Sequence, residues 1–142
     1  MDNDLNSESN DILIEQYNNY KNVLNEMEEL EKGDFENDTS TLYTLKNVVR
    51  PKTKVALQFY FNLKLESNLF YFSDNGTNFA NIIINDETKH LINDYLEGSQ
   101  VCINYENNLI YLKLGTTDEL FNINFLCKQF IDALSYINNL LK

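Results

Sequence analysis

The chain is poor in several residue types that would identify a common class of protein. Among its 142 residues are two cysteines, one histidine, one proline and no tryptophan. Cys102 and Cys127 form no CxxC motif, so the sequence predicts neither a disulfide framework nor a cysteine-based metal site. No apolar run approaches the roughly 18 residues that a bilayer-spanning helix needs. The first ten residues are acidic and polar, unlike a secretory or mitochondrial leader, so we expect a cytoplasmic or nuclear protein.

Groups that could carry catalysis are equally sparse. His90 is the single histidine, and no cysteine lies near it in the sequence to form a catalytic pair. Cys102 and Cys127 are expected on the inward faces of a strand and a helix, which is the ordinary place for an inert thiol. Cys127 is the better candidate for a reactive thiol, because Lys128 follows it and a helix start is expected nearby. We therefore expect no enzymatic activity and no cofactor.

The sequence has no phosphate-binding glycine loop and no complete calcium loop. The four glycines are spread along the chain at expected turns and helix ends, so they form no phosphate-binding loop; they are Gly33, Gly76, Gly98 and Gly115. Asp34, Glu36 and Asp38 alternate like the start of a calcium loop. The glycine required at its sixth position is Thr39, and the glutamate required at its twelfth is Leu45. We therefore predict no metal site and interpret residues 34–40 as an acidic linker.

The negative charge of the chain is concentrated at its beginning. The formal net charge is -11, which argues against general nucleic-acid binding because a phosphate backbone would be repelled. Residues 1–40 contain 12 acidic residues and 2 lysines, a net charge of -10. The remaining 10 acidic and 9 basic residues give residues 41–142 a net charge of -1. A mimic of nucleic acid would spread its carboxylates over a rigid surface, whereas these are clustered.

The acidic N-terminal part divides into three predicted segments. Residues 1–9 are expected to be a disordered tail. Residues 10–33 are predicted to be an amphipathic helix that ends at Gly33, and residues 34–40 are the linker. The helix carries an apolar stripe at spacings of 4, 3, 4 and 3, formed by Leu13, Tyr17, Tyr20, Leu24 and Met27. This stripe either docks on the rest of the chain or joins two copies as a homodimer.

Residues 41–142 are predicted to be a β-rich domain that begins with two long strands. Residues 41–49 form the first strand, which ends before Pro51. Residues 54–66 give the clearest pattern in the sequence, because apolar side chains alternate strictly from Val55 to Leu65. This period of two predicts a long strand with one buried face and one wetter face.

Two hairpins and two helices are expected in the rest of the domain. Asn75-Gly76 predicts a hairpin between residues 69–72 and 77–84, because both residues tolerate positive φ. A short helix, 87–97, follows with Asp86 as its cap. A second hairpin joins Val101–Tyr105 to Ile110–Leu114. Residues 118–125 fit either a strand or the opening of a helix, and an apolar stripe from Leu126 onward predicts a C-terminal amphipathic helix.

These elements predict an α+β fold: an N-terminal helix, a mostly antiparallel sheet or partly closed barrel of 5–7 strands, a short middle helix and a C-terminal helix. With residues 41–49 and 118–125 both as strands, the element order resembles pleckstrin-homology-like barrels. Without them it is similar to the small acidic dimeric chaperones of type III secretion. Both resemblances concern element order, so no functional residue is carried over from either family.

A basic cluster and two sets of aromatic residues are the candidate binding sites. The basic cluster falls within nine residues that include no acid and consists of Lys46, Arg50, Lys52 and Lys54. The resemblance to pleckstrin-homology-like barrels implies that such a loop could hold phosphate or phosphoinositide, with peripheral membrane contact through residues 46–54. The alternative is a solvated loop tip or an intramolecular partner of the acidic segment 26–38.

The aromatic candidates point to protein binding. Tyr60 and Tyr71 are expected on the wetter face of the sheet, where they either pack across strands or form a docking patch. On the helix, Tyr17, Tyr20, Leu24 and Met27 are the candidates. We expect a non-enzymatic protein-binding module, namely an adaptor, assembly factor, chaperone or inhibitor. The alternatives are a phosphate reader and an acidic immunity or anti-defence protein that blocks a basic partner.

Overall fold

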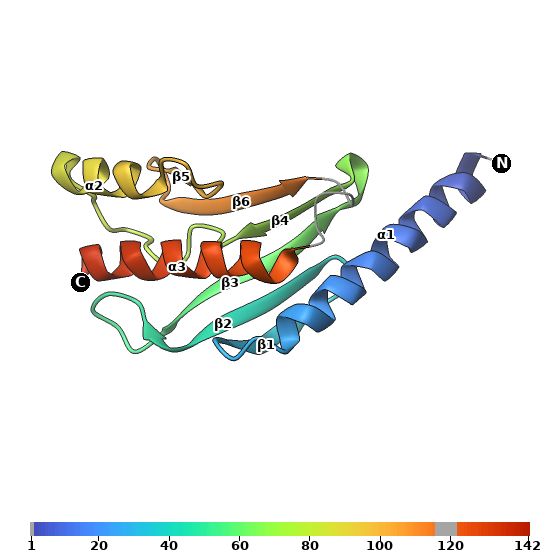
Figure 1. Cartoon of the computed structure of the whole chain (residues 1–142), viewed down its shortest axis with the longest axis horizontal. Helices are drawn as coiled ribbons and strands as arrows, with labels where there is room; N and C mark the ends of the chain where they lie inside the picture. Colours follow the sequence, from blue (N-terminus) through green and yellow to red (C-terminus); the bar gives the residue numbers. More distant parts are fainter. Residues whose placement is uncertain (1, 116–121) are drawn as a thin grey trace.

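The computed structural model describes the backbone of residues 2–115 and 122–142, and the side chains of residues 10–115 and 122–142. It confirms the α+β class, with three helices and one antiparallel sheet (Figure 1). The elements are α1 (Asp2–Asn25), β1 (Leu30–Glu36), β2 (Ser40–Val49), β3 (Ala56–Lys64), a single 3-10 turn (Leu65–Ser67), β4 (Leu69–Ser73), α2 (Asp86–Leu96), β5 (Cys102–Asn104), β6 (Leu109–Gly115) and α3 (Ile123–Leu141).

The sheet is open and has the strand order β1-β2-β3-β4-β6-β5. Its six strands lie within the predicted range, and β1 and β5 form its edges. The alternative of residues 118–125 as a strand is wrong for residues 123–125, because Ile123 begins α3. Residues 118–121 lie outside the described part of the chain. Nothing in the sheet therefore confirms a pleckstrin-homology-like barrel.

The core is an aromatic layer between the sheet and the helices. The alternation predicted for residues 54–66 is confirmed within β3, where Leu57, Phe59 and Phe61 are completely buried on one face. The predicted ends are wrong, because Val55 is exposed and Leu65 belongs to the 3-10 turn. Phe130 of α3 contacts Phe59 and Phe72, with ring centroids 5.4 and 5.6 Å apart respectively. Burying such rings removes large apolar areas from water, and edge-to-face or offset contacts add to that gain. In Figure 1, α3 lies across the strands along this layer.

Helix α1 is docked on the same layer. Tyr17 is completely buried and stacks on Phe61, with ring centroids 4.6 Å apart. Its hydroxyl donates a hydrogen bond to the Phe61 carbonyl oxygen at 2.5 Å and lies 3.0 Å from Oγ1 of Thr41. Leu13 and Leu24 of the same stripe are also buried. Of the two interpretations of the helical stripe, the structure shows docking on the sheet, while the N-terminal end of α1 extends past the body (Figure 1).

A group of ion pairs attaches α1 to strand β1. Lys21 is 9% exposed and forms an ion pair with Glu36 of β1 at 2.6 Å. Lys32 contacts the other carboxylate oxygen of Glu36 at 2.5 Å. The hydrogen bonds from Lys21 and then Lys32 lower the pKa of Glu36 to about 2, so this carboxylate stays ionised at neutral pH. The acidic strand β1 is thus joined to the helix before it.

The N-terminal boundaries differ from the predicted ones. The helix begins at Asp2 rather than at residue 10, and it ends at Asn25 rather than at Gly33. The residues taken as its last turn and as an acidic linker form β1, whose Leu30 is buried opposite Leu45. Gly33 is therefore a strand residue: a Cβ there would meet Leu42 at 2.8 Å. Charged residues suit an edge strand because they oppose pairing with other chains. A strand of this kind has no alternating apolar pattern, so local periodicity does not predict it.

The predicted first hairpin is also wrong beyond its turn. Asn75 and Gly76 do have positive φ, 54° and 71°, as that turn requires. However, residues 77–84 form no strand, because β6 occupies the free edge of β4. Asn78 instead turns inward and bonds both backbone groups of Gln58, at 2.9 and 2.7 Å. The pairing of β4 with β6 depends on residues distant in the sequence, which a local turn signal cannot specify.

The later elements agree more closely with the sequence. The middle helix is capped by Asn85, which accepts a hydrogen bond from the Thr88 amide, rather than by Asp86. The second hairpin is confirmed as β5 and β6. Cys127 is buried as predicted, whereas Cys102 is exposed because it lies on the outer side of the edge strand. None of the helices in the described part of the chain combines the length and apolarity needed to cross a membrane.

The packing of α1 predicts that removing the Tyr17 hydroxyl lowers the stability of the protein measurably. Tyr17→Phe keeps the stacked ring but leaves the Phe61 carbonyl oxygen without its buried donor. We expect the free energy of unfolding, measured by urea denaturation, to fall by about 1–2 kcal/mol. Tyr111→Phe is the control, because its hydroxyl bonds no described residue, and it should change the value by less than about 0.5 kcal/mol. Equal effects of the two variants would contradict this account of α1.

Candidate docking surface

The sheet has a second face that α1 and α3 do not cover. In β3, β4 and β6 the side chains alternate between the aromatic core and this outer side. Most of the outer side chains are partly accessible. We call this surface the open face; its main residues are Leu42, Tyr60, Asn62, Lys64, Leu69, Tyr71, Leu109, Tyr111 and Lys113. It spans the middle strands of the sheet.

Strand register brings three tyrosines together on the open face. Tyr60 of β3 is opposite Ser73 of β4, which in turn is opposite Tyr111 of β6. Tyr71 lies one row further along β4, so it is a diagonal neighbour of both other tyrosines. At the far side, Phe35 of β1 packs edge-to-face on Tyr60, with centroids 6.0 Å apart. Aromatic side chains from β1, β3, β4 and β6 are therefore grouped on this face, and we call this group the aromatic band.

A shallow hollow lies beside this band. Its volume is about 400 Å³, and its lining comes from β3, β4, β5 and β6: Lys64, Leu69, Tyr71, Ser73, Asn104, Leu109, Tyr111 and Lys113. Leu69 and Leu109 supply apolar surface within it. Lys64 and Lys113 lie on the two strands that flank β4. The lining of the hollow therefore combines two leucines with two lysines.

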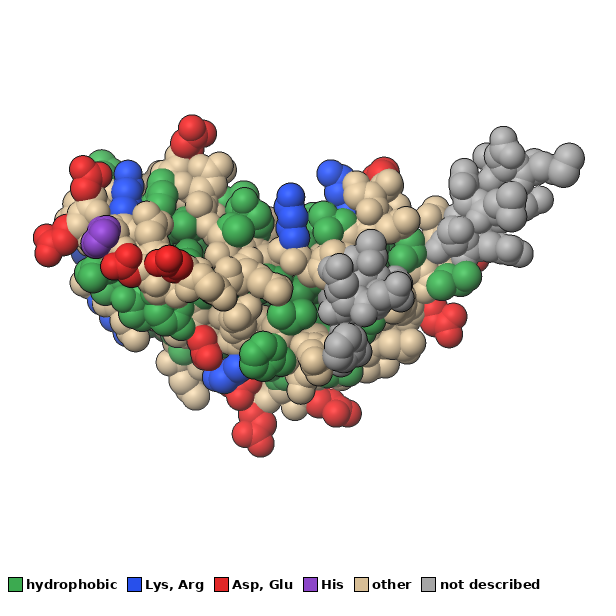
Figure 2. All heavy atoms as spheres, turned by 45° about the horizontal axis from the view of Figure 1, so that its top comes forward, with side chains coloured by type: hydrophobic (Ala, Val, Ile, Leu, Met, Phe, Trp, Pro, Cys, Tyr) green, Lys and Arg blue, Asp and Glu red, His purple; other side chains and the backbone are tan. Residues whose placement is uncertain are grey.

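Charge is divided between the strands and the rest of the chain. Strands β2 to β6 contain no aspartate or glutamate, and they contain three lysines, Lys46, Lys64 and Lys113. The acidic residues in the described part of the chain therefore lie in β1, in the helices or in the connections. Figure 2 shows acidic side chains mainly around the rim of the visible surface, with hydrophobic and uncharged side chains between them. The open face is locally basic on a protein that is acidic as a whole.

Several hydrogen-bonding side chains of the open face have no partner within the described residues. The hydroxyls of Tyr60, Tyr71 and Tyr111 bond no other described group, and neither Lys64 nor Lys113 forms an ion pair there. A tyrosine hydroxyl can donate and accept, and an ammonium group has three donors. The face thus combines apolar area with donors that a bound group could satisfy.

The two sets of aromatic candidates have different placements. Tyr60 and Tyr71 lie together on the open face, as their strand positions predict. Tyr17 and Leu24 are buried in the core and are not accessible to a partner in this structure. Tyr20 and Met27 are partly buried against the same core. Because α1 docks on the core, Tyr60 and Tyr71 of the open face are the more accessible of the aromatic candidates.

Further open-face residues were not among the candidates. Tyr111, Lys113, Leu69 and Leu109 alternate outward along β4 and β6 just as Tyr71 does. Their own periodicity could have identified them as outward residues. The pairing of β4 with β6, which brings these residues next to Tyr71, could not be predicted from the sequence. Lys64 could have been found at the end of the long alternating strand.

The four basic candidates do not share one environment. Lys52 and Lys54 are exposed in the connection between β2 and β3. Arg50 is partly buried; burial lowers its pKa, nearby Asp74 opposes that shift, and its Nε has no hydrogen-bond partner among described groups. Lys46 instead lines a different groove. Phosphate binding by this cluster stays a prediction, with Lys52 and Lys54 as its accessible members.

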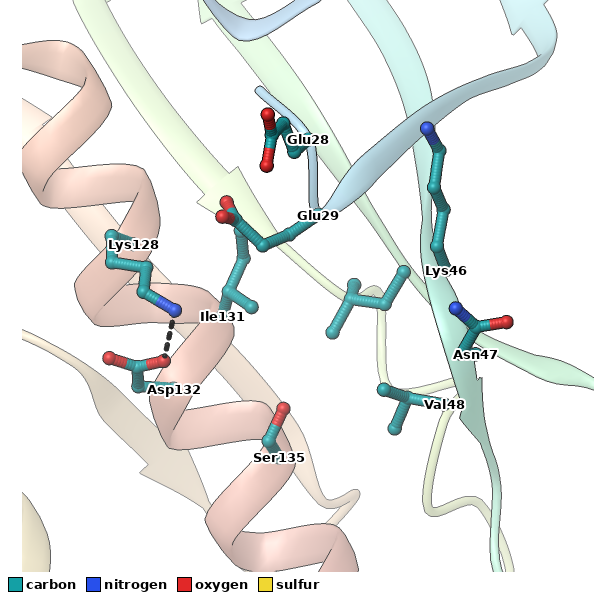
Figure 3. A pocket seen from close by; sticks show the side chains of 10 residues that line it. Glu28, Glu29, Lys46, Asn47, Val48, Lys128, Ile131, Asp132 and Ser135 are labelled. Atoms are coloured by element: carbon teal, nitrogen blue, oxygen red, sulfur yellow. Dashed lines mark ion pairs between the residues drawn. The ribbon is translucent and has the colours of Figure 1, made fainter.

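That groove lies between α3, the turn before β1, and β2 (Figure 3). It has a volume of about 360 Å³ and contains both signs of charge. Lys128 and Asp132 of α3 form an ion pair at 3.0 Å, and the hydrogen bond that Lys128 donates to Asp132 raises the pKa of Lys128. Glu28 and Glu29 approach from the turn, while Lys46 points away from α3 in Figure 3. Because the groove contains both acidic and basic side chains, its charge does not favour a ligand of either sign.

The residues considered for catalysis lie apart. His90 is exposed on α2 and its Nε2 lies 3.5 Å from Asp94. Burial raises the pKa of the Cys127 thiol, which keeps it protonated and unreactive at neutral pH. In the described part of the chain, no three histidine, cysteine or acidic side chains converge as metal ligands.

Comparisons of the chain with protein-family models, curated proteins and solved structures gave no match.

Asp74 is a buried carboxylate that holds the end of β4 to β6. It is completely buried, and its Oδ1 accepts hydrogen bonds from the amides of Ile110 and Gly76, both at 2.9 Å. Burial raises the pKa of Asp74 to about 6, while these hydrogen bonds, Asn78 and Arg50 act in the opposite direction. Asp74 immediately follows Ser73, so it positions the strand ends that carry the open face.

This raised pKa predicts how stability changes with pH. Because the folded-state pKa exceeds the ordinary 3.8, the folded chain binds a proton at Asp74 more tightly than the unfolded chain does. The contribution of Asp74 to stability is complete below about pH 4 and is lost as the pH rises through about 6. Between pH 7.5 and 4 it should add at most roughly 3 kcal/mol to the free energy of unfolding.

Asp74→Asn isolates this effect, because other acidic residues also titrate in the same range. The difference in unfolding free energy between the native chain and the variant should change by up to roughly 3 kcal/mol over that pH range. Denaturant unfolding at several pH values measures it. Parallel stability curves for the two proteins would show that Asp74 does not have the raised pKa.

Proposed function

We propose that this protein is a non-enzymatic binding module that holds another protein on its open face. The observation that carries the proposal is the aromatic band of Tyr60, Tyr71 and Tyr111 beside a hollow with two leucines. Tyrosine is enriched in protein interfaces, because it offers a large rigid apolar area together with a hydroxyl. The partly exposed leucines add apolar area that a partner would remove from water.

The arrangement of the surface also favours a protein partner over a small ligand. The hollow is shallow, and its polar groups are spread along four strands rather than converging on one point. Small-molecule sites are typically concave and bury most of the ligand. A sheet face with a polar rim suits the broad contact that protein interfaces make. An adaptor, assembly factor, chaperone or inhibitor would each use such a surface.

The proposal predicts that partner capture depends on the tyrosines of the open face. Tyr71→Ala with Tyr111→Ala should abolish or strongly reduce recovery of a specific protein in affinity purification read by mass spectrometry. Each substitution removes an aromatic contact worth about 1–2 kcal/mol or more at the centre of an interface. The native full-length chain is the reference, and folding of each variant is checked by circular dichroism and thermal unfolding.

Tyr95→Ala is the matched control. Tyr95 is 41% exposed but lies on α2, where it stacks on Tyr136 of α3 with centroids 4.0 Å apart. The control variant should recover the same protein as the native chain. If the folded double variant also recovers it undiminished, or if the native chain recovers no specific protein, the open face is not the docking surface.

A further inference from the structure

We infer that the open face takes an acidic segment of its partner, with an apolar side chain in the hollow and carboxylates at Lys64 and Lys113. This inference rests on the proposed function and names the chemistry of the partner. Its first support is the charge of the sheet. The five strands β2 to β6 carry three lysines and no acid in a chain whose net charge is -11.

The position of the two lysines gives the second support. Lys64 is at the end of β3 and pairs with Leu69, whereas Lys113 of β6 pairs with Tyr71. They therefore lie on opposite sides of β4, about 10 Å apart from strand to strand. A segment lying over β4 would pass between two ammonium groups. Within the described residues, neither lysine has an acidic partner to displace.

The rest of the hollow's lining gives the third support. Leu69 and Leu109 provide apolar surface inside the hollow, and the Tyr71 and Tyr111 hydroxyls can donate to carboxylate oxygens. Hydrogen bonds to charged groups are stronger than neutral ones, so these donors favour a carboxylate over an amide. An apolar residue flanked by Asp or Glu satisfies both parts of the surface. A basic segment would meet the lysines with like charge.

Single-stranded nucleic acid is the competing occupant, because aromatic side chains and lysines also bind bases and phosphates. Three features favour the acidic protein segment. The tyrosines are partly packed against their neighbours, two lysines offer few phosphate contacts, and the net charge of -11 repels a polyanion along its length. A short acidic segment places only its few carboxylates near the locally basic face.

The test uses the full chain and a short dye-labelled peptide in which Glu and Leu alternate, followed by fluorescence anisotropy. The native protein should bind this peptide, and raising the salt concentration should weaken binding. Lys64→Gln with Lys113→Gln should reduce the affinity by about tenfold. The control is Lys52→Gln with Lys54→Gln, which removes the same charge from the exposed connection and should change the affinity by less than about twofold.

Several results would overturn the inference. These are no binding of the Glu-Leu peptide, equal binding of a peptide with Lys in place of Glu, and equal losses in the two double variants. Tighter binding of a thymidine oligonucleotide that is lost in the Lys64 and Lys113 variant would assign the face to nucleic acid instead. If partner capture requires Tyr71 and Tyr111 but not the two lysines, the proposed function stands and the acidic segment is wrong.

Discussion

The packing of aromatic rings on one side of the sheet is the constraint on which the rest of the structure depends. Phe59, Phe61 and Phe72 are buried on that side, where Phe130 of α3 and Tyr17 of α1 complete the layer. Each strand must send alternate side chains to the other face. Because both long helices are committed to the core side, the outward tyrosines and leucines are left for solvent or for a partner.

The division of charge follows from the same arrangement. Apart from the buried Asp74, the described acidic residues are exposed on the helices, the connections and the edge strand β1, where water solvates them or lysines pair with them. Glu36 illustrates the paired case, because Lys21 and Lys32 hold its pKa at about 2. The strands between the edges contain no acid. The acidity of the first 40 residues therefore lies largely on a helix that docks on the core and on an edge strand of the sheet.

Much of this fold could be predicted from the sequence, and the failures share a physical cause. The alternating strand β3, the hairpin of β5 and β6, and the C-terminal helix are encoded by local periodicity. Strand β1 was missed because its charged residues suit an edge and resemble a helix end or a linker. Residues 77–84 were misassigned because the long-range pairing of β4 with β6 decides which segment is a strand.

The candidate site could likewise be predicted from the sequence only in part. Outward orientation of Tyr60 and Tyr71 follows from alternation, but their proximity to Tyr111 and Lys113 requires the strand order. Burial of Tyr17 likewise depends on the sheet to which α1 docks. Periodicity alone cannot distinguish a stripe that meets its own core from one that meets another molecule.

Site-specific photo-crosslinking tests the central claim most directly. A photoreactive phenylalanine analogue replaces Leu69 on the open face or, in a second protein, the exposed Leu91 on α2. Our account predicts that the first protein crosslinks to a specific partner protein and that the second does not. Crosslinking from α2 but not from the open face would contradict the claim that the uncovered side of the sheet is the docking surface.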